Sequence, residues 1–134
     1  MSSTDQPENG NFILTPSTPY LWRVPQNDNL WQGVNGVNNP CPSGYRLPTS
    51  TELNNERLTW SSNNNVGAFN SPLKWPHSGG RDAITGQLNT TLGYLWTSTV
   101  IGFYARTIDF STVNAYLWDS SARSMGCTVR CIKN

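Results

Sequence analysis

The chain has 134 residues, enough for one domain with its own apolar core. Charged residues make up 13% of it and the net charge is +1, without a basic block, which argues against nucleic acid or an anionic membrane as partner. No apolar run approaches about 18 residues, so we predict no insertion into a membrane.

The N-terminal part is predicted to begin with a flexible tail over residues 1–12, because this segment is polar and low in apolar residues. The domain is expected to span residues 13–134. Short strands are predicted at Phe12–Leu14 and Tyr20–Val24, the second one ending at a proline. Asn, Ser and Thr are abundant throughout, which favours strands and turns over long helices.

The central stretch, residues 39–53, reads N-P-C-P-S-G-Y-R-L-P-T-S-T-E-L. Pro48 disfavours helix at the residue before it, so the chain should arrive extended. Thr49 is then predicted to cap a helix, with Glu52 three residues later completing a capping box. We expect this helix to end within residues 59–63, where an asparagine-rich loop begins.

The second half of the chain has the pattern of an antiparallel sheet. Turn signals at Gly79-Gly80 and Thr85-Gly86 frame a predicted hairpin over Arg81–Leu88. The gaps between the later strands are short enough for antiparallel connections. These strands are predicted at Tyr94–Ser98, Phe103–Phe110, Asn114–Trp118 and Cys127–Ile132.

The three cysteines allow two interpretations, three buried thiols or one disulfide with a free thiol. Residues 127, 129 and 131 would share the inner face of the last strand, but a Cys127–Cys131 bridge would strain an extended segment. We predict a disulfide between Cys41 and Cys131, with Cys127 as a buried thiol. No cofactor or metal site is predicted, because His77 is the only histidine and no C-x-x-C occurs.

Three segments resemble a known family in content and order. They are L-W-Q-G-V-N-G-V-N-N-P-C-P-S-G-Y-R-L-P-T-S-T-E-L at 30–53, G-Y-L-W-T-S-T at 93–99 and G-C-T-V-R-C-I-K at 126–133. Over residues 20–134 the chain resembles the Fibrobacter succinogenes major paralogous domain and its relatives, which include the C-terminal domain of the Legionella collagen-like adhesin. The specific part of the resemblance is C-P-S-G-Y-R-L-P-T with a terminal V-R-C.

The resemblance implies an α+β domain with a C-type-lectin-like fold of the formylglycine-generating-enzyme type. In this fold a small twisted antiparallel sheet carries one or two short helices and long irregular loops. Relatives occur as tips of bacterial adhesins, in phage tail fibres and as variable proteins of diversity-generating retroelements. Cys127 departs from the family, since many relatives have an aromatic residue there. The lectin calcium signatures E-P-N and W-N-D are absent, so calcium-dependent sugar binding is not expected.

The sequence does not predict an enzyme. It has no G-x-S-x-G, H-E-x-x-H, phosphate-binding loop or dinucleotide fingerprint, and His77 lies in a loop that we expect to be solvated. One enzymatic alternative comes from the resemblance: formylglycine-generating enzymes use a C-terminal cysteine pair to hold copper, and Cys127 with Cys131 would be that pair here.

The aromatic residues divide into a predicted core and a predicted surface. Trp22, Trp31 and Trp96 are expected in the core. Strand alternation turns Tyr116 and Trp118 away from their aliphatic neighbours and therefore outward. Rings supply contact area at a low entropy cost and short polar groups supply hydrogen bonds. The predicted ligand-binding surface comprises Tyr104, Arg106, Asn114, Tyr116, Trp118, Asp119 and Arg123; the alternative is a solvated or oligomer-facing sheet.

We therefore expect a non-catalytic recognition module that binds a cell-surface glycan or protein receptor. Its expected setting is the tip of a phage tail fibre or bacterial adhesin, hence extracellular, on a cell surface or on a virion. A homotrimer within a larger fibre is compatible with that setting. The alternative is a structural module that trimerises at a fibre end without a ligand of its own.

Overall fold

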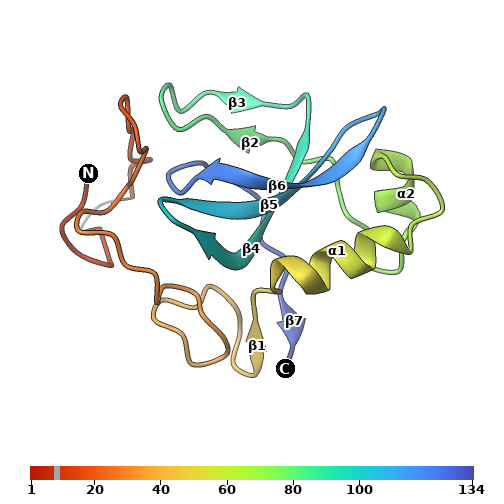
Figure 1. Ribbon diagram of the computed structural model, residues 1–134, viewed down its shortest axis with the longest axis horizontal. Helices are drawn as coiled ribbons and strands as arrows, with labels where there is room; N and C mark the ends of the chain where they lie inside the picture. Colours follow the sequence, from red (N-terminus) through yellow and green to blue (C-terminus); the bar gives the residue numbers. More distant parts are fainter. Residues whose placement is uncertain (8–9) are drawn as a thin grey trace.

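The computed structural model describes residues 1–7 and 10–134 and has an α+β architecture, as expected. Its centre is a three-stranded antiparallel sheet, and helix α1 packs across this sheet and contacts all three strands (Figure 1). The strand order is β4–β5–β6. These elements span Ser50–Leu58 for α1, Gly93–Ile101 for β4, Tyr104–Phe110 for β5 and Ala115–Ala122 for β6.

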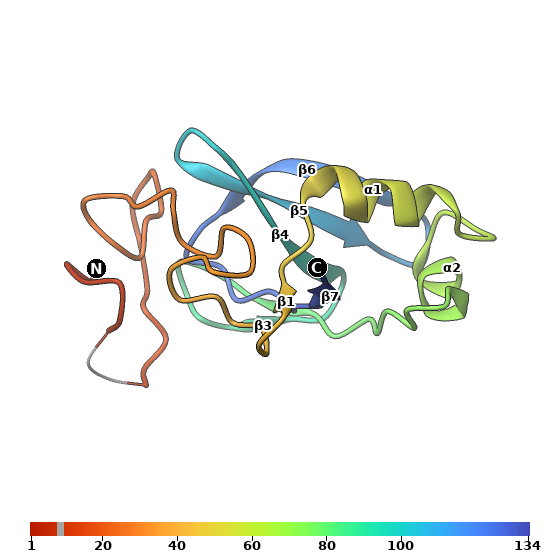
Figure 2. The ribbon, with the colours of Figure 1, turned by 90° about the horizontal axis from the view of Figure 1, so that it is seen from below.

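Two small strand pairs and a second helix complete the fold. Strands β1 and β7 pair with each other, as do β2 and β3, all antiparallel. The elements are β1 at Tyr45–Arg46, α2 at Asn65–Asn70, β2 at Gly80–Arg81, β3 at Leu88–Asn89 and β7 at Ile132–Lys133. Seen from below, the sheet lies between α1 and the β1–β7 pair (Figure 2). None of the helices formed by the described residues is long and apolar enough to cross a membrane.

The sheet separates two apolar clusters. Leu95 and Ile108 are paired across β4 and β5, and Trp96 and Thr107 are the next pair, on the opposite face. The cluster beneath α1 contains the buried residues Leu53, Ala68, Trp75, Leu95, Ile108, Phe110 and Ala115. The cluster on the other face contains Leu47, Trp96 and Ala105, with Trp31, Cys41, Met125, Cys127 and Val129 packed against them.

Helix α1 begins with the predicted capping box. The Glu52 backbone N–H donates to the Thr49 hydroxyl over 3.3 Å, and the Thr49 N–H donates to the Glu52 carboxylate over 2.8 Å. Arg46 donates to both carboxylate oxygens of Glu52 at 2.7 and 2.9 Å. This bidentate pairing, helped by the Thr49 bonds, lowers the pKa of Glu52 to about 2. The cap therefore also fastens β1 to the helix.

The predicted disulfide is confirmed. Cys41 and Cys131 are bonded, with their Cα atoms 5.7 Å apart and a sequence separation of 90. Cys127 is a free, half-buried thiol. Burial, with a smaller contribution from the charge of Asp109, raises the pKa of this thiol. The bond ties the loop before α1 to the C-terminal segment.

Several strand predictions are wrong in detail. Phe12–Leu14 and Tyr20–Val24 form no strand, because Tyr20 adopts a left-handed backbone (φ 57°) and the flanking prolines lack N–H donors. The predicted strand Cys127–Ile132 is reduced to one parallel bridge between Thr128 and Leu95 before β7 begins. The chain leaves the sheet between them to bring Cys131 to its disulfide partner.

Helix α2 replaces part of a predicted loop, and local capping explains it. The Asn64 side chain accepts hydrogen bonds from the backbone N–H groups of Val66 and Gly67, at 3.1 and 3.2 Å. This is the arrangement of an asparagine N-cap. The Asn63-Asn64-Asn65 sequence, taken as a loop signal, therefore starts a helix.

The N-terminal segment, predicted as a flexible tail over residues 1–12, makes contacts with the domain. The Ser2 N–H donates to the Trp22 carbonyl over 2.7 Å, and the Val24 N–H donates to the Ser2 carbonyl over 2.9 Å. Asp5 forms an ion pair with Arg23 at 2.5 Å. Residues 8–9 of the predicted tail lie outside the described part of the chain. The described part of this segment is thus tied to residues 22–24 of the domain.

Candidate binding site

The predicted surface is spread over several places on the molecule. Tyr116 and Trp118 lie on the sheet face opposite Ala115 and Leu117, and Trp118 is 47% exposed. Their rings meet edge to face, with centroids 6.0 Å apart and planes at 69°. These two rings are the part of the predicted surface that the structure brings together as an aromatic pair.

The charged members of the predicted surface lie elsewhere. Arg106 pairs with Asp119 at 2.8 Å, and its guanidinium also reaches the Ser50 hydroxyl at 3.4 Å, at the start of α1. Asn114 lies in the turn before β6, where its carbonyl accepts from the Ser111 N–H over 2.8 Å. Arg123 lies just beyond the other end of β6. The structure therefore does not gather the seven residues into one patch.

Tyr104 also stands apart from the aromatic pair. It pairs with Ala122 at the far end of β6 and lines a small depression together with Tyr20 and the loop at Asp82–Ile84. Asp82 caps that loop by accepting from the N–H groups of Ile84 and Thr85. The bonds from Thr85, more than the one from Ile84, lower the pKa of Asp82.

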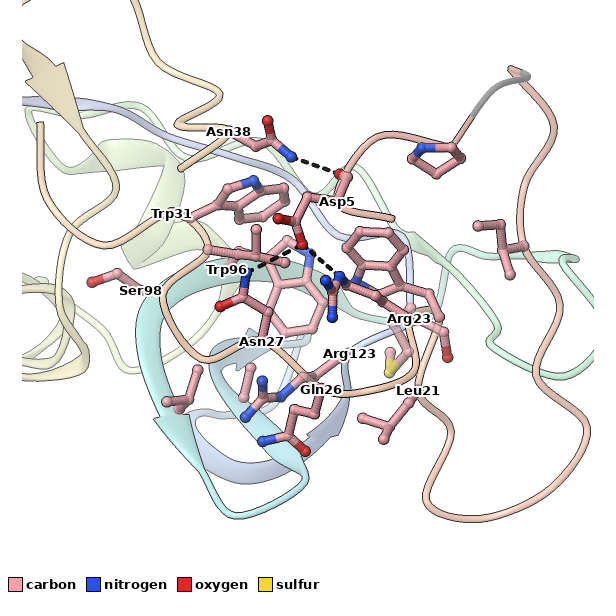
Figure 3. A pocket seen from close by; sticks show the side chains of 18 of the residues that line it. Asp5, Leu21, Arg23, Gln26, Asn27, Trp31, Asn38, Trp96, Ser98 and Arg123 are labelled. Atoms are coloured by element: carbon pink, nitrogen blue, oxygen red, sulfur yellow. Dashed lines mark hydrogen bonds and ion pairs between the residues drawn. The ribbon is translucent and has the colours of Figure 1, made fainter. Parts of the chain in front are cut away.

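A pocket of about 400 Å³ lies between the N-terminal segment, the loops at 20–38 and the ends of β4 and β5 (Figure 3). Three indoles line it, those of Trp22, Trp31 and Trp96. Trp96 is buried in the core as predicted, and Trp31 is half-buried and packs against the same cluster. Trp22 is half-buried and belongs to neither apolar cluster, a correction to its assignment as a core residue.

The backbone at Trp31 is unusual. Its φ is 62°, in the left-handed region that non-glycine residues rarely adopt. Its N–H donates to the Val37 carbonyl over 2.9 Å, which fixes the loop that carries it. Residues held in this region cost about 1–3 kcal/mol and concentrate at binding and active sites. This strained backbone is consistent with a Trp31 ring that is oriented by its loop and not by a helix or strand.

One wall of the pocket is an ion pair surrounded by amides. Asp5 contacts Arg23 at 2.5 Å and accepts from the Asn27 side chain at 3.2 Å. The backbone carbonyl of Asp5 accepts from the Asn38 side chain at 2.6 Å, and Asn38 in turn accepts from Gln6 at 3.1 Å. Figure 3 shows these groups converging beside Trp96. The N-terminal segment is thereby fastened to two separate loops.

The opposite wall is a second ion pair with its own amide. Arg123 donates to the Asp28 carboxylate over 2.7 Å and to the Gly102 carbonyl over 2.8 Å. The Gln26 amide nitrogen donates to the same two acceptors, at 2.5 and 2.9 Å. The bonds from Gln26 and then Arg123 lower the pKa of Asp28, so its carboxylate stays ionised. This network joins the 25–29 loop to the β4–β5 turn.

Two polar atoms of this second wall are buried without a hydrogen-bond partner. They are the side-chain oxygen Oε1 of Gln26 and the Nε–H of Arg123. Both residues line the pocket. Buried polar atoms are nearly always paired, so an unpaired acceptor and an unpaired donor in one wall call for an explanation.

The chemistry of the pocket is stacking and hydrogen bonding. Its described lining residues include no histidine, cysteine or glutamate. Nowhere in residues 1–7 and 10–134 do three or more His, Cys, Asp or Glu side chains gather where they could hold a metal ion. Cys131 is bonded to Cys41, so it cannot join Cys127 in a copper-binding thiol pair. His77 is exposed, as predicted.

Comparison of the chain with models of known protein families, with curated proteins and with solved structures gives no match. Sequence reasoning selected Arg123 but missed Asp5, Gln26 and Asn27. The sequence signal that could have pointed to the pocket is the high content of Trp, Asn and Gln over residues 22–39. Such a composition is also common in ordinary surface loops.

Proposed function

We propose that this chain is a non-catalytic recognition module with a C-type-lectin-like fold, which binds a cell-surface glycan or protein receptor through the pocket between its N-terminal segment and β4. The observation that supports this most is the pocket lined by Trp22, Trp31 and Trp96. Large rings in a concave site supply contact area while losing little conformational freedom on binding.

The walls of the pocket are arranged before any ligand arrives. Its volume of about 400 Å³ falls in the range of small-ligand sites, roughly 300–1,000 Å³. Two ion pairs, Asp5 with Arg23 and Asp28 with Arg123, hold the loops in place. A site that is already ordered loses less entropy on association, which favours specific binding.

The disulfide supports an extracellular setting. A disulfide such as Cys41–Cys131 forms and persists in oxidising surroundings. The tip of a phage tail fibre or bacterial adhesin, on a virion or cell surface, is the setting we propose. The long loops that build the pocket, together with a small sheet and two short helices, are the features that fit a C-type-lectin-like domain.

A cell-binding assay tests this function and its location together. We expect fluorescently labelled protein to bind a subset of bacterial strains. Trp31→Gly should reduce that binding at least tenfold, because it removes a ring that can contribute about 2 kcal/mol or more at the centre of a site. Glycine adopts the left-handed backbone of this position without strain, so the variant should stay folded.

Trp118→Ala is the matched control, since it removes an indole that does not line the pocket. It should bind like the unchanged protein. Loss of binding in Trp118→Ala with full binding in Trp31→Gly would move the site to the Tyr116–Trp118 face. Stable trimers that bind none of a broad set of strains and glycans would instead support the structural alternative and overturn the proposed function.

A further inference from the structure

We infer that two copies of this chain form a two-fold dimer, in which the β6 strands pair antiparallel and cross at Leu117. The inference goes beyond the proposed function, because this surface lies outside the pocket and needs no ligand. Three observations carry it: the unpaired outer edge of β6, the exposed rings beside that edge and the opposite charges at its two ends.

The outer edge of β6 has no partner strand within the described part of the chain. β6 is the last strand of the β4–β5–β6 sheet, and none of its residues takes part in an isolated β-bridge. In the turn before it, the Ser111 N–H donates to the Asn114 carbonyl over 2.8 Å. Along an antiparallel pair, residues bonded in this way alternate with residues whose backbone groups point away from the pair. Ala115 and Leu117 therefore direct their N–H and C=O groups to the outside of the sheet.

The β6 strand of a second copy offers groups that match this edge. When the two strands run antiparallel and Leu117 faces Leu117 of the second copy, the N–H of each donates to the C=O of the other. The strand contains neither proline nor lysine, which commonly protect edges, and its irregular register begins only beyond Trp118. The pairing joins the two three-stranded sheets into one continuous sheet.

The exposed rings fit the same register. Tyr116 and Trp118 lie on the sheet face opposite α1, and Trp118 is 47% exposed. With Leu117 at the centre, each Trp118 lies opposite Tyr116 of the second copy. These are non-hydrogen-bonded pairs, in which side chains across two strands come closest. The edge-to-face contact within one copy is thereby extended to four rings, and both indoles are removed from water.

One end of the edge carries a positive charge without a counter-ion. Arg57, in the last turn of α1, donates to the Ala115 carbonyl over 3.2 Å. The other acceptors of its guanidinium are the side-chain oxygens of two asparagines. No carboxylate among the described residues forms an ion pair with it. This cation is therefore available to an acidic group that arrives at the edge.

The other end of the edge carries the complementary charge. Asp119 pairs with Arg106, which also reaches the start of α1, so Asp119 lies on the helix side of the sheet. Its side chain is nevertheless 60% exposed. Two strands that cross at Leu117 place Asp119 of each copy opposite Ala115 of the other, and so beside Arg57. The antiparallel arrangement forms this contact twice, whereas a parallel one would place like ends together.

The dimer leaves both pockets open, since no residue from 114 to 121 lines the pocket described above. One strand from each copy is a small interface, so we expect a dissociation constant of roughly 10 µM. Labelled protein at nanomolar concentration is then monomeric, and Trp118→Ala remains a valid control for cell binding. Where copies are concentrated on a surface, the dimer joins two pockets and raises avidity.

Sedimentation equilibrium of the full chain over about 1–500 µM tests the dimer, since this range brackets the expected constant. Arg57→Glu and Asp119→Lys each place like charges opposite one another at both ends of the edge. Each variant alone should dimerise at least about tenfold more weakly. An equal mixture of the two variants restores both opposite-charge pairs and should associate nearly as well as the unchanged protein. Rescue in the mixture also shows that both variants are folded.

Arg130→Glu is the matched control, because Arg130 is exposed and lies outside both β6 and α1. It should leave the dissociation constant unchanged. Trp118→Ala should raise it about tenfold, since it removes both cross-strand ring pairs. Amide hydrogen exchange followed by NMR reports the pairing itself. The Leu117 N–H should be protected at high protein concentration only, whereas the Tyr116 N–H, bonded to β5, should be protected at every concentration.

Four results would each overturn the inference. They are a chain that stays monomeric at the highest concentration, a dimer that both charge variants leave intact, a trimer, and a Leu117 N–H whose exchange does not depend on concentration. Protection of this N–H only after an extended peptide is added would assign the edge to a peptide partner instead. None of these results affects the proposed function, which is measured on the monomer through Trp31→Gly, and loss of cell binding leaves the dimer standing.

Discussion

The scaffold and the pocket walls of this domain are built by different means. The scaffold, α1 with the β4–β5–β6 sheet and the disulfide, is held by ladder hydrogen bonds, two apolar clusters and a covalent bond. The walls, residues 1–7 and 20–38, contain no helix or strand of two or more residues and are held largely by side-chain hydrogen bonds and ion pairs. We therefore expect stability and the proposed recognition to depend on largely separate sets of residues.

The two regions do not differ in how completely their polar groups are paired. In the scaffold, every carboxylate oxygen of Glu52 has a donor, from Arg46 and the Thr49 cap. Buried polar atoms without a hydrogen-bond partner occur in both regions: Gln26 Oε1 and Arg123 Nε in the walls, and Trp60 Nε1, Trp75 Nε1 and Ser71 Oγ in the scaffold. The difference between the regions therefore lies in the kind of contact that holds them.

Removal of the disulfide should give the largest effect and the clearest test of this separation. Cys41→Ser/Cys131→Ser should lower the free energy of unfolding by about 4 kcal/mol, given the length of the loop that the bond closes. Urea unfolding measures the loss. Since neither residue lines the pocket, ligand affinity measured at 10 °C on the folded fraction should stay the same. A parallel loss of affinity would show that the two regions are coupled.

Asp109 gives a pH-dependent prediction within the scaffold. Its side chain is 5% exposed, accepts from the Thr107 hydroxyl at 2.6 Å and forms no ion pair with the described residues. Burial raises its pKa from 3.8 to about 6. Between these values the folded state holds a proton that the unfolded chain has released. Stability therefore falls as pH rises through this window, by roughly 3 kcal/mol, and stays lower above it.

Asp109→Asn should remove this dependence. The variant should be more stable than the unchanged protein at pH 7, by up to about 3 kcal/mol, and nearly equal to it at pH 4. Glu52 acts in the opposite sense, since its lowered pKa stabilises the fold above pH 4.5 and this contribution fades toward pH 2. Unfolding curves from pH 4 to 8 would separate the two groups. A variant less stable at pH 7 would contradict the prediction.

Asp5→Asn changes a residue of the pocket walls and should have the smallest effect on stability. It tests whether the walls affect binding more than they affect folding. The Asp5–Arg23 pair is partly exposed, so its loss should cost about 1 kcal/mol or less. Its effect on recognition should be larger, because Arg23 would then carry an uncompensated charge into the pocket. On a glycan array, we expect sialylated or sulfated glycans to gain affinity relative to uncharged ones. An unchanged ranking of glycans would show that Arg23 does not read ligand charge.

The scaffold could be predicted from sequence where its signals are local. The capping box needs only Thr49 and Glu52, and the β2–β3 hairpin needs only its turn residues. The disulfide followed from the proline-framed Cys41 and the position of Cys131. The prediction failed over residues 20–24, since the backbone conformation of Tyr20 and the pairing of Arg23 with Ser2 depend on contacts with the N-terminal segment.

The pocket could not be predicted, because no single segment contains it. Its walls bring Asp5 to Arg23 and Asn38, and Arg123 to Asp28, across up to 95 residues of chain. Alternation within β6 placed Tyr116 and Trp118 on the expected face, but it carries no information about loops. Trp22 and Trp31 have the large apolar rings expected in a core, and only the folded structure shows that both are half-buried and line the pocket.

The two ends of the chain differ in how they can be used for surface attachment. Asp5 lines the pocket and Ser2 is bonded to the adjacent residues 22 and 24, so an affinity tag or sensor linkage at Met1 would lie close to the pocket. At the other end, the Asn134 N–H donates to the Gly44 carbonyl over 3.1 Å, which holds the C-terminus beside the disulfide loop and away from the N-terminal segment (Figure 1). Immobilisation through a C-terminal extension would therefore present the open pocket to the analyte.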